Sequence, residues 1–229
     1  MDTTGLILLS SALALAISLS LVRKKEYNFT TVKALVFTVL TCLFGFIGTK
    51  LMYMLEHLEY GILFNGVSFF GSVFFIPIAM FVLTRFTKDS FGRCMDFFGP
   101  YILPTVGIMR IGCYLGGCCS AHRIIFMGQQ IVPPIQLVEF VFDFVIFIAL
   151  LLYHQKYCKN ETGTLYPKVM IGYSFVRLIM EHYRDTDKDV IGMSRGQWYA
   201  ITAFIVGIIV LAVLKAIRLK HQTQKEQIK

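Results

Sequence analysis

Seven apolar runs, each long enough to cross a bilayer as a helix, constrain the fold of this chain more than any other feature. The third, fourth and sixth runs carry polar interruptions. With 56% hydrophobic and 16% charged residues, the chain lacks the composition of a soluble domain. We therefore predict an all-α fold, a polytopic membrane protein with seven transmembrane helices. The expected spans lie near residues 4–22, 32–54, 66–84, 97–118, 133–153, 165–182 and 198–217.

Basic residues are distributed unevenly over the connections between these runs. When the connections are assigned alternately to two sides, fifteen of the 22 Lys and Arg residues fall on one side, five on the other and two within the membrane. The positive-inside rule makes the richer side cytoplasmic, so we expect the N-terminus outside and the C-terminus inside. Asp2 precedes the first run and Arg23 follows it, the reverse of a cleavable signal, which predicts a retained anchor.

The formal net charge of +8 does not indicate nucleic-acid binding. The basic residues flank apolar runs instead of forming one face, and residues in such places set topology and contact lipid headgroups. No repeat, low-complexity linker or soluble domain interrupts the pattern. We expect one transmembrane domain over residues 1–229, with the membrane lipid bilayer as a partner and no nucleic acid.

Three of the expected helices carry an ionisable residue within the membrane. At about 1.5 Å per residue, Arg110, Glu139 and Arg177 each lie within about 12 Å of the outer end of their helix. An ionisable group at bilayer depth costs at least ~2.5–3.5 kcal/mol on insertion scales, so a chain retains one mainly for pairing, ligand binding or chemistry. The sequence therefore predicts that charge converges in one layer of the outer leaflet.

Two helices repeat polar residues along one face. Gln136 and Asp143 share a face with the carboxylate in the fifth run, and Glu181 and Arg184 share one with the arginine in the sixth. One interpretation is that the arginines pair with carboxylates and hold helices together. The other is a cavity open to the outer leaflet, in which arginines bind a phosphate through paired hydrogen bonds.

Three of the six cysteines cluster around the end of the fourth run, and several interpretations stay open. They could be reduced cysteines packed as small hydrophobes, a disulfide near the oxidising face, or a metal-binding or reactive thiol group. A metal site would use Cys118 and His122, four residues apart on a helix, with Cys119 beside them. Cys113 is a poor candidate, because on a continuous helix it lies ~140° around the axis from Cys118.

Several short motifs follow one another through nearly the whole chain. They are Gly48-Thr-Lys50 with Tyr53, Gly66-Val-Ser68-Phe69-Phe70-Gly71, Asp96 with Pro100, Arg110-Ile-Gly112-Cys113-Tyr114, Pro134-Ile-Gln136-Leu137-Val-Glu139, Arg177-Leu-Ile-Met-Glu181-His-Tyr183-Arg184 and Gly196-Gln197-Trp198. In order and spacing they resemble the prolipoprotein diacylglyceryl transferase family. Members of this family are seven-helix bacterial enzymes that move diacylglycerol from phosphatidylglycerol to the thiol of a lipobox cysteine.

The resemblance implies a transferase that is a multi-pass protein of the bacterial plasma (inner) membrane. Its substrates would be phosphatidylglycerol and a lipoprotein precursor with a lipobox cysteine, and we expect no cofactor and no metal ion. Arg110 would contact the phosphate, where arginines neutralise charge on the departing group. The implied catalytic residues are Glu139 and Arg177. The implied substrate-binding residues are Arg110, Gln136, Glu181 and Arg184.

The chain departs from the family pattern at several polar positions. The family histidine falls at Phe70, the signature asparagines at Cys113 and Gly116, and the signature glutamate at Cys118. If that histidine activates the acceptor thiol, Glu139 or His122 must take its place, or the reaction must differ. Two alternatives to transfer follow. One is a non-catalytic protein that binds lipid or lipoprotein, and the other is a thiol- or metal-dependent membrane protein using Cys113, Cys118 and Cys119.

Overall fold

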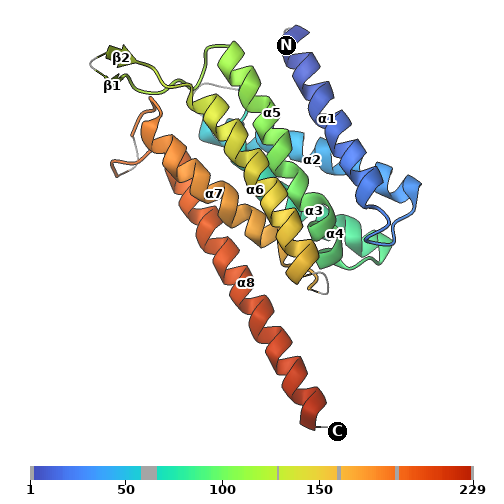
Figure 1. Cartoon of the computed structure of the whole chain (residues 1–229). Coiled ribbons are helices and arrows are strands. Elements are labelled where there is room, and N and C mark those ends of the chain that lie inside the picture. Colours follow the sequence, from blue (N-terminus) through green and yellow to red (C-terminus); the bar gives the residue numbers. More distant parts are fainter. Residues whose placement is uncertain (1–2, 58–65, 128, 159–160, 189–190, 228–229) are drawn as a thin grey trace.

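The protein is described by a computed structural model over residues 3–57, 66–127, 129–158, 161–188 and 191–227. Over these residues the chain is almost entirely helical (Figure 1). The long helices are α1 (Thr3–Arg23), α2 (Thr31–Glu56), α3 (Phe70–Thr87), α5 (Ile102–Leu115), α6 (Ile135–Tyr157), α7 (Leu165–Tyr183) and α8 (Arg195–Gln227). A short helix, α4 (Phe91–Phe98), precedes α5, and a small hairpin of β1 (Ile124–Phe126) and β2 (Gln129–Ile131) follows it.

Among the residues that the structure describes, five helices are long and apolar enough to cross a membrane. They are α1, α2, α3, α6 and α8. This confirms the prediction of a helical membrane protein. The other two expected spans are less regular. α5 has only 14 residues, and α7 carries Lys168, Arg177 and Glu181 within its 19 residues. A count of seven spans and the side of each terminus remain predictions.

The expected helix over residues 97–118 is divided into three pieces. α4 ends at Phe98, a tight turn of 3-10 helix covers Gly99–Tyr101, and α5 then begins. Pro100 lies in this turn, and proline cannot donate the backbone hydrogen bond of a helix interior. α5 ends at Leu115, three residues before the expected end, because Gly116 and Gly117 follow and Gly117 has φ +66°.

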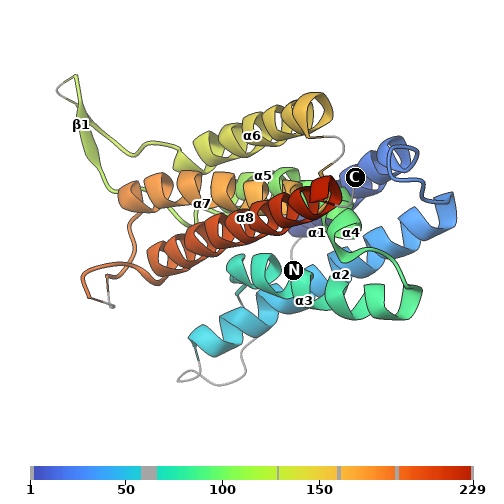
Figure 2. The ribbon, with the colours of Figure 1, turned by 90° about the horizontal axis from the view of Figure 1, so that it is seen from below.

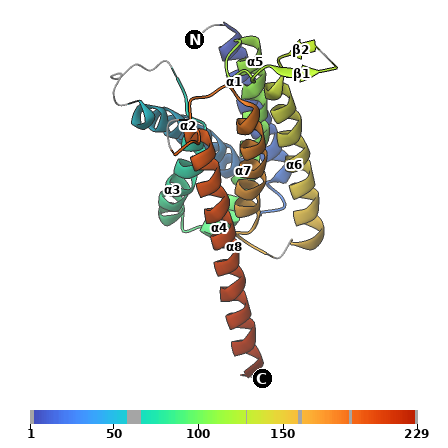
Figure 3. The ribbon, with the colours of Figure 1, turned by 90° about the vertical axis from the view of Figure 1, so that its left-hand side faces the viewer.

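The helices pack in a continuous order around the molecule. α5 packs between α1 and α6, α7 between α6 and α8, while α2 and α3 cover the remaining side between α1 and α8 (Figure 2). α2 and α3 cross closely at two glycines, since a Cβ on Gly71 would lie 2.0 Å from the carbonyl oxygen of Gly48. Figure 3 shows the C-terminal part of α8 extending beyond the other helices.

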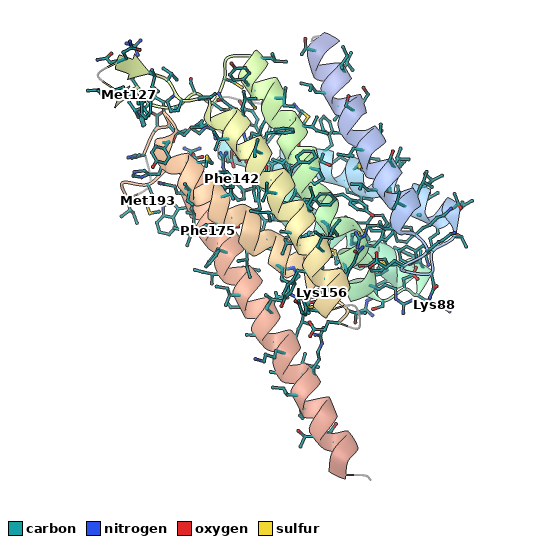
Figure 4. All side chains as sticks on the ribbon, viewed as in Figure 1. Lys88, Met127, Phe142, Lys156, Phe175 and Met193 are labelled. Atoms are coloured by element: carbon teal, nitrogen blue, oxygen red, sulfur yellow. The ribbon has the colours of Figure 1, made fainter. Side chains whose placement is uncertain are left out.

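The outward faces of the helices are apolar between two ends of different character. Phe142 and Phe175 point away from the bundle, with exposed fractions of 46% and 56% (Figure 4). Lys88 and Lys156 lie toward one end of the bundle, and Met127 lies at the other, in the hairpin connection (Figure 4). This arrangement fits a protein whose middle faces hydrocarbon and whose ends face water.

Two buried charged residues join helices at the lysine-bearing end. Arg23, which the sequence suggested as a loop charge, is buried and donates to the carbonyl oxygen of Phe97 at 3.0 Å. Asp96 accepts the backbone N–H of Leu165 at 2.8 Å and those of Gly163 and Tyr166. A side chain on α4 therefore caps the N-terminus of α7, where backbone N–H groups lack helical partners.

Candidate functional site

Glu139 is the centre of a buried ion-pair group contributed by three helices. Arg110 on α5 places Nη2 3.0 Å from Glu139 Oε1. Arg177 on α7 places Nη1 3.1 Å from the same oxygen and 3.2 Å from Oε2. All three side chains are buried. The prediction that charges from three different helices meet in one layer is thus confirmed.

Glu181 forms the second half of the group. Its Oε2 lies 2.7 Å from Arg177 Nη2 and 3.3 Å from Arg184 Nη1. Its Oε1 accepts a hydrogen bond from Ser194 at 3.0 Å, just before α8. A Cβ on Gly196 would lie 2.7 Å from the same oxygen, so the absence of a side chain there leaves room for the carboxylate. Arg177 therefore bridges two glutamates and connects α6, α7 and the start of α8.

The group retains capacity for an anion. Three arginines face two glutamates in these ion pairs, so the pairs hold one more cation than carboxylate, before the neighbouring Asp143 carboxyl group is counted. The Nε atoms of Arg110, Arg177 and Arg184 are buried and have no hydrogen-bond partner among the described residues. Unpaired donors on buried guanidinium groups are costly, and an anion with several oxygens would satisfy them.

Two further polar side chains lie buried on the same helix faces. Asp143 follows Glu139 by four residues, and Tyr173 precedes Arg177 by four, so each shares a face with a member of the ion-pair group. The Asp143 carboxylate and the Tyr173 hydroxyl lack a hydrogen-bond partner within the described part of the chain. The spacing revealed Asp143 as a polar position, but nothing in the sequence distinguishes Tyr173 from the other ten tyrosines.

Phe70 occupies the position at which the family pattern has a histidine. Its ring is buried, with its centre 5.8 Å from that of Tyr173 and 5.6 Å from that of Tyr199. The aromatic contacts hold α3 against α7 and α8. His122, the other suggested replacement for a base, places Nδ1 3.2 Å from Asp185 Oδ1 in an exposed pair.

Gln136 lies three residues before Glu139 on α6 and holds the segment after α5. Its Nε2 donates to the carbonyl oxygen of Cys118 at 2.8 Å. The next residues are attached to the chain after α7, because the Asp185 N–H donates to the Ser120 carbonyl at 3.0 Å and the His122 N–H to Tyr183 at 2.9 Å. The segment from 116 to 122, called here the cysteine loop, thus joins α5, α6 and α7.

The structure corrects the expectation for the clustered cysteines. Because α5 ends at Leu115, residues 118 and 122 do not share a helical face, and the proposed pairing of Cys118 with His122 is wrong. The chain turns back at Gly117 and at Cys119, which has φ +62°. As a result the Sγ atoms of Cys113, Cys118 and Cys119 lie within 4.8 Å of one another, so the argument that made Cys113 a poor candidate was also wrong.

All six cysteines lie in the described part of the chain, and none of them forms a disulfide. Cys119 lies near Arg184 and Arg110 as well as the Cys113 thiol. A hydrogen bond from Cys113 and the positive charges of the two arginines lower the pKa of Cys119 below its ordinary value, although burial alone would raise it. The cysteine loop therefore carries sulfur atoms beside the ion-pair group.

Comparison with known proteins adds a family assignment. A family model described as "Prolipoprotein diacylglyceryl transferase" matches residues 5–213. A phosphatidylglycerol–prolipoprotein diacylglyceryl transferase 2 of Clostridium perfringens is 27% identical over 200 residues, which cover 78% of this chain and 77% of the relative. A similarly named protein of Clostridium tetani is 25% identical over 74% of this chain and 76% of its own length. One from Methylobacillus flagellatus is 28% identical over 74% and 71%.

Proposed function

Because this chain belongs to the prolipoprotein diacylglyceryl transferase family, we propose that it moves a diacylglyceryl group from phosphatidylglycerol to the cysteine thiol of a lipoprotein precursor. The family match covers 209 of 229 residues. The relatives are named for this activity, and the alignments with them cover most of both chains. The observation that carries the proposal is the buried Arg110–Glu139–Arg177 group, which combines excess positive charge with unpaired arginine donors.

In the proposed reaction a thiolate attacks the glycerol carbon that bears the phosphate. A carbon–sulfur bond forms, the carbon–oxygen bond breaks, and glycerol phosphate leaves with the electron pair. Arg110 binds the phosphate, and Arg177 neutralises the charge that develops on the departing oxygen, a role for preorganised charge. Gln136, Glu181 and Arg184 complete the substrate-binding set.

Glu139 has an orienting role in this mechanism. Its carboxylate accepts hydrogen bonds from Arg177 and pairs with Arg110, so it fixes the spacing of two guanidinium groups. Two adjacent cations also make a carboxylate a weak proton acceptor. We therefore infer that Glu139 positions the arginines, and that the thiol proton leaves by another route or to the medium.

We also propose seven membrane spans, with the N-terminus outside and the C-terminus in the cytoplasm of a bacterium. The sixth and fourth spans are then α7 and the composite of α4, the 3-10 turn and α5. The lysine-bearing end of Figure 4 faces the cytoplasm, and the hairpin end faces outward. The ion-pair group belongs to the outer half, since Arg177 lies near the C-terminus of α7 and Glu139 near the N-terminus of α6.

The transfer assay tests this function directly. Purified full-length protein in nanodiscs is mixed with radiolabelled phosphatidylglycerol and a lipobox peptide. We expect label on the peptide and release of glycerol phosphate, and no label on a peptide whose cysteine is replaced by serine. Wild-type protein that binds phosphatidylglycerol but transfers nothing would contradict the proposal.

That negative result would favour a second function, a lipid-binding protein without catalysis. Phe70 is the observation that favours it, because an apolar ring fills the place of the family histidine and packs against Tyr173. Rescue of a cell depleted of its own diacylglyceryl transferase separates the two functions in vivo. Rescue requires catalysis, and a binding protein does not provide it.

A further inference from the structure

Three thiols gather at the outer end of α5 without belonging to the proposed reaction, whose nucleophile comes from the substrate. Cys113 lies in the last turn of α5, and Cys118 and Cys119 lie on the cysteine loop that folds back over it. Cys118 is exposed, while Cys113 and Cys119 are half-buried. The group is therefore open on one side and enclosed on the other.

The sulfur spacing fits coordination of one ion. Sulfur atoms bonded at about 2.3 Å to a tetrahedral Zn²⁺ lie about 3.8 Å apart. Cys118 Sγ and Cys119 Sγ are 3.8 Å apart, and all three sulfur atoms fall within 4.8 Å of one another. Zn²⁺ and Cu⁺ are the biological ions that prefer such soft ligands.

A disulfide explains the group less completely. Neighbouring residues have Cα atoms about 3.8 Å apart, below the usual range of about 4.4–6.8 Å for a disulfide, so Cys118 and Cys119 are poorly placed to bond with each other. A bond from Cys113 to one of them would leave the other thiol over. Only a ligand that takes three thiols uses the whole arrangement.

The surroundings offset part of the charge of a filled site. Arg184 and Arg110 both lie close to Cys119. Three thiolates with one Zn²⁺ carry a net charge of −1, which these arginines partly offset. Binding replaces the thiol protons by the metal ion and releases them to water.

We propose that Cys113, Cys118 and Cys119 form a binding site for one thiophilic metal ion, Zn²⁺ or Cu⁺, with a fourth position open on the exposed side. The bound ion fixes the cysteine loop, which is already attached to Gln136 and to Asp185 by backbone hydrogen bonds. A bound metal ion therefore makes the segment beside the ion-pair group more rigid. Metal binding does not require transferase activity, because the three thiols are not used in the proposed transfer.

Metal binding is measured on reduced, full-length protein in nanodiscs. Separate samples receive Zn²⁺ or Cu⁺, excess metal is removed over a mild chelator, and metal per chain is determined by mass spectrometry. We expect equimolar metal and X-ray absorption that reports sulfur ligands at bonding distance. Zn²⁺ retention without Cu⁺ retention, or the reverse, identifies the ion. Co²⁺ supplies an optical probe through thiolate charge-transfer absorption.

The chain provides its own matched control, because three cysteines lie in this group and three outside it. Replacement of Cys113, Cys118 and Cys119 by Ser should abolish retention, and Cys118→Ser alone should weaken affinity by more than about tenfold. Because Cys118 is exposed, this single variant should fold normally. Replacement of Cys42, Cys94 and Cys158 by Ala should leave binding intact.

Two outcomes would overturn the proposal. Equal metal retention by wild type and the Cys113, Cys118, Cys119 triple Ser variant would identify adventitious binding elsewhere. Thiol alkylation that finds Cys113 disulfide-bonded in freshly isolated protein, together with no metal uptake after reduction, would identify a redox pair instead. Both results are read without a transfer assay, so they do not depend on the proposed function.

Discussion

At the scale of single residues, Arg177 has both a structural and a chemical position. It bridges Glu139 on α6 and Glu181 on its own helix, so its removal leaves Glu139 with Arg110 and Glu181 with Arg184 as their remaining ion pairs. Breaking a buried ion pair from one side costs about 3–5 kcal/mol. Alanine variants therefore report stability as well as chemistry, and substitutions that preserve charge or shape separate the two more cleanly.

Arg110→Lys preserves the charge but removes the planar pair of donors that suits a phosphate. We expect a loss of transfer of about 10²–10³-fold, comparable to removal of a preorganised donor, with normal protein levels in the membrane. Specific activity per folded protein is the measurement. Arg85→Lys, at an exposed arginine near the end of α3, is the control and should be silent. A fully active Arg110→Lys would mean that this arginine only joins helices.

Tyr173→Phe tests the buried hydroxyl that has no partner in the described structure. Removing an unsatisfied buried hydroxyl is nearly neutral or stabilising, so thermal unfolding should be unchanged or shifted upward. If the hydroxyl serves the substrate, transfer should still fall by at least about tenfold, or 1.4 kcal/mol. A variant with unchanged transfer would restrict Tyr173 to packing against Phe70.

Glu139→Gln and the triple change of Cys113, Cys118 and Cys119 to Ser should differ in their effect on transfer. The glutamine removes the charge that separates two arginines, so we expect a severe loss. The serine variant should retain transfer within roughly tenfold, about 1.4 kcal/mol, although it loses metal. The two specific activities measured side by side decide the matter. The reverse order would show that the protein's own thiols carry the reaction.

At the scale of elements, the sequence predicted the site better where helices are regular. Polar spacing on α6 and α7 placed Glu139 and Arg177 on inward faces, and the structure brings both to Arg110. The division of the fourth run was missed, because hydropathy does not register a change from α-helix to 3-10 helix at Pro100. The early end of α5 was also missed, since its apolar composition continues past Gly116.

The contact between α4 and α7 depends on Asp96, whose carboxylate accepts backbone N–H groups at the start of α7. Asp96→Ala should lower the free energy of unfolding by about 1–3 kcal/mol, because buried donors lose their acceptor. Asp89→Ala breaks a partly exposed pair with Lys33 at 2.6 Å and should cost at most about 1 kcal/mol. Unfolding in identical nanodiscs compares them. A larger effect from Asp89→Ala would contradict this view of the cap.

At the scale of the whole molecule, charge and hydropathy divide the bundle into layers. Apolar side chains such as Phe142 and Phe175 face outward in the middle, while Lys88 and Lys156 lie toward one end (Figure 4). The C-terminal part of α8 extends beyond the same end (Figure 1), and the sequence of α8 includes Lys215, Arg218 and Lys220. The ion-pair group lies toward the opposite end, with the hairpin. Membrane orientation therefore decides which leaflet supplies the phospholipid.

Reporter fusions test that orientation. Because basic residues concentrate at the α8 end, a tag at the C-terminus and one in the α3–α4 connection at Lys88 should both be cytoplasmic, whereas a tag at Lys188, after α7, should be external. Labelling of intact cells with a membrane-impermeant reagent should reach only the third tag, and permeabilised cells should expose all three. An accessible C-terminus in intact cells would invert the molecule. The ion-pair group would then face the cytoplasmic leaflet. No exported lipoprotein precursor presents its cysteine there, so the proposed transfer would lose its acceptor.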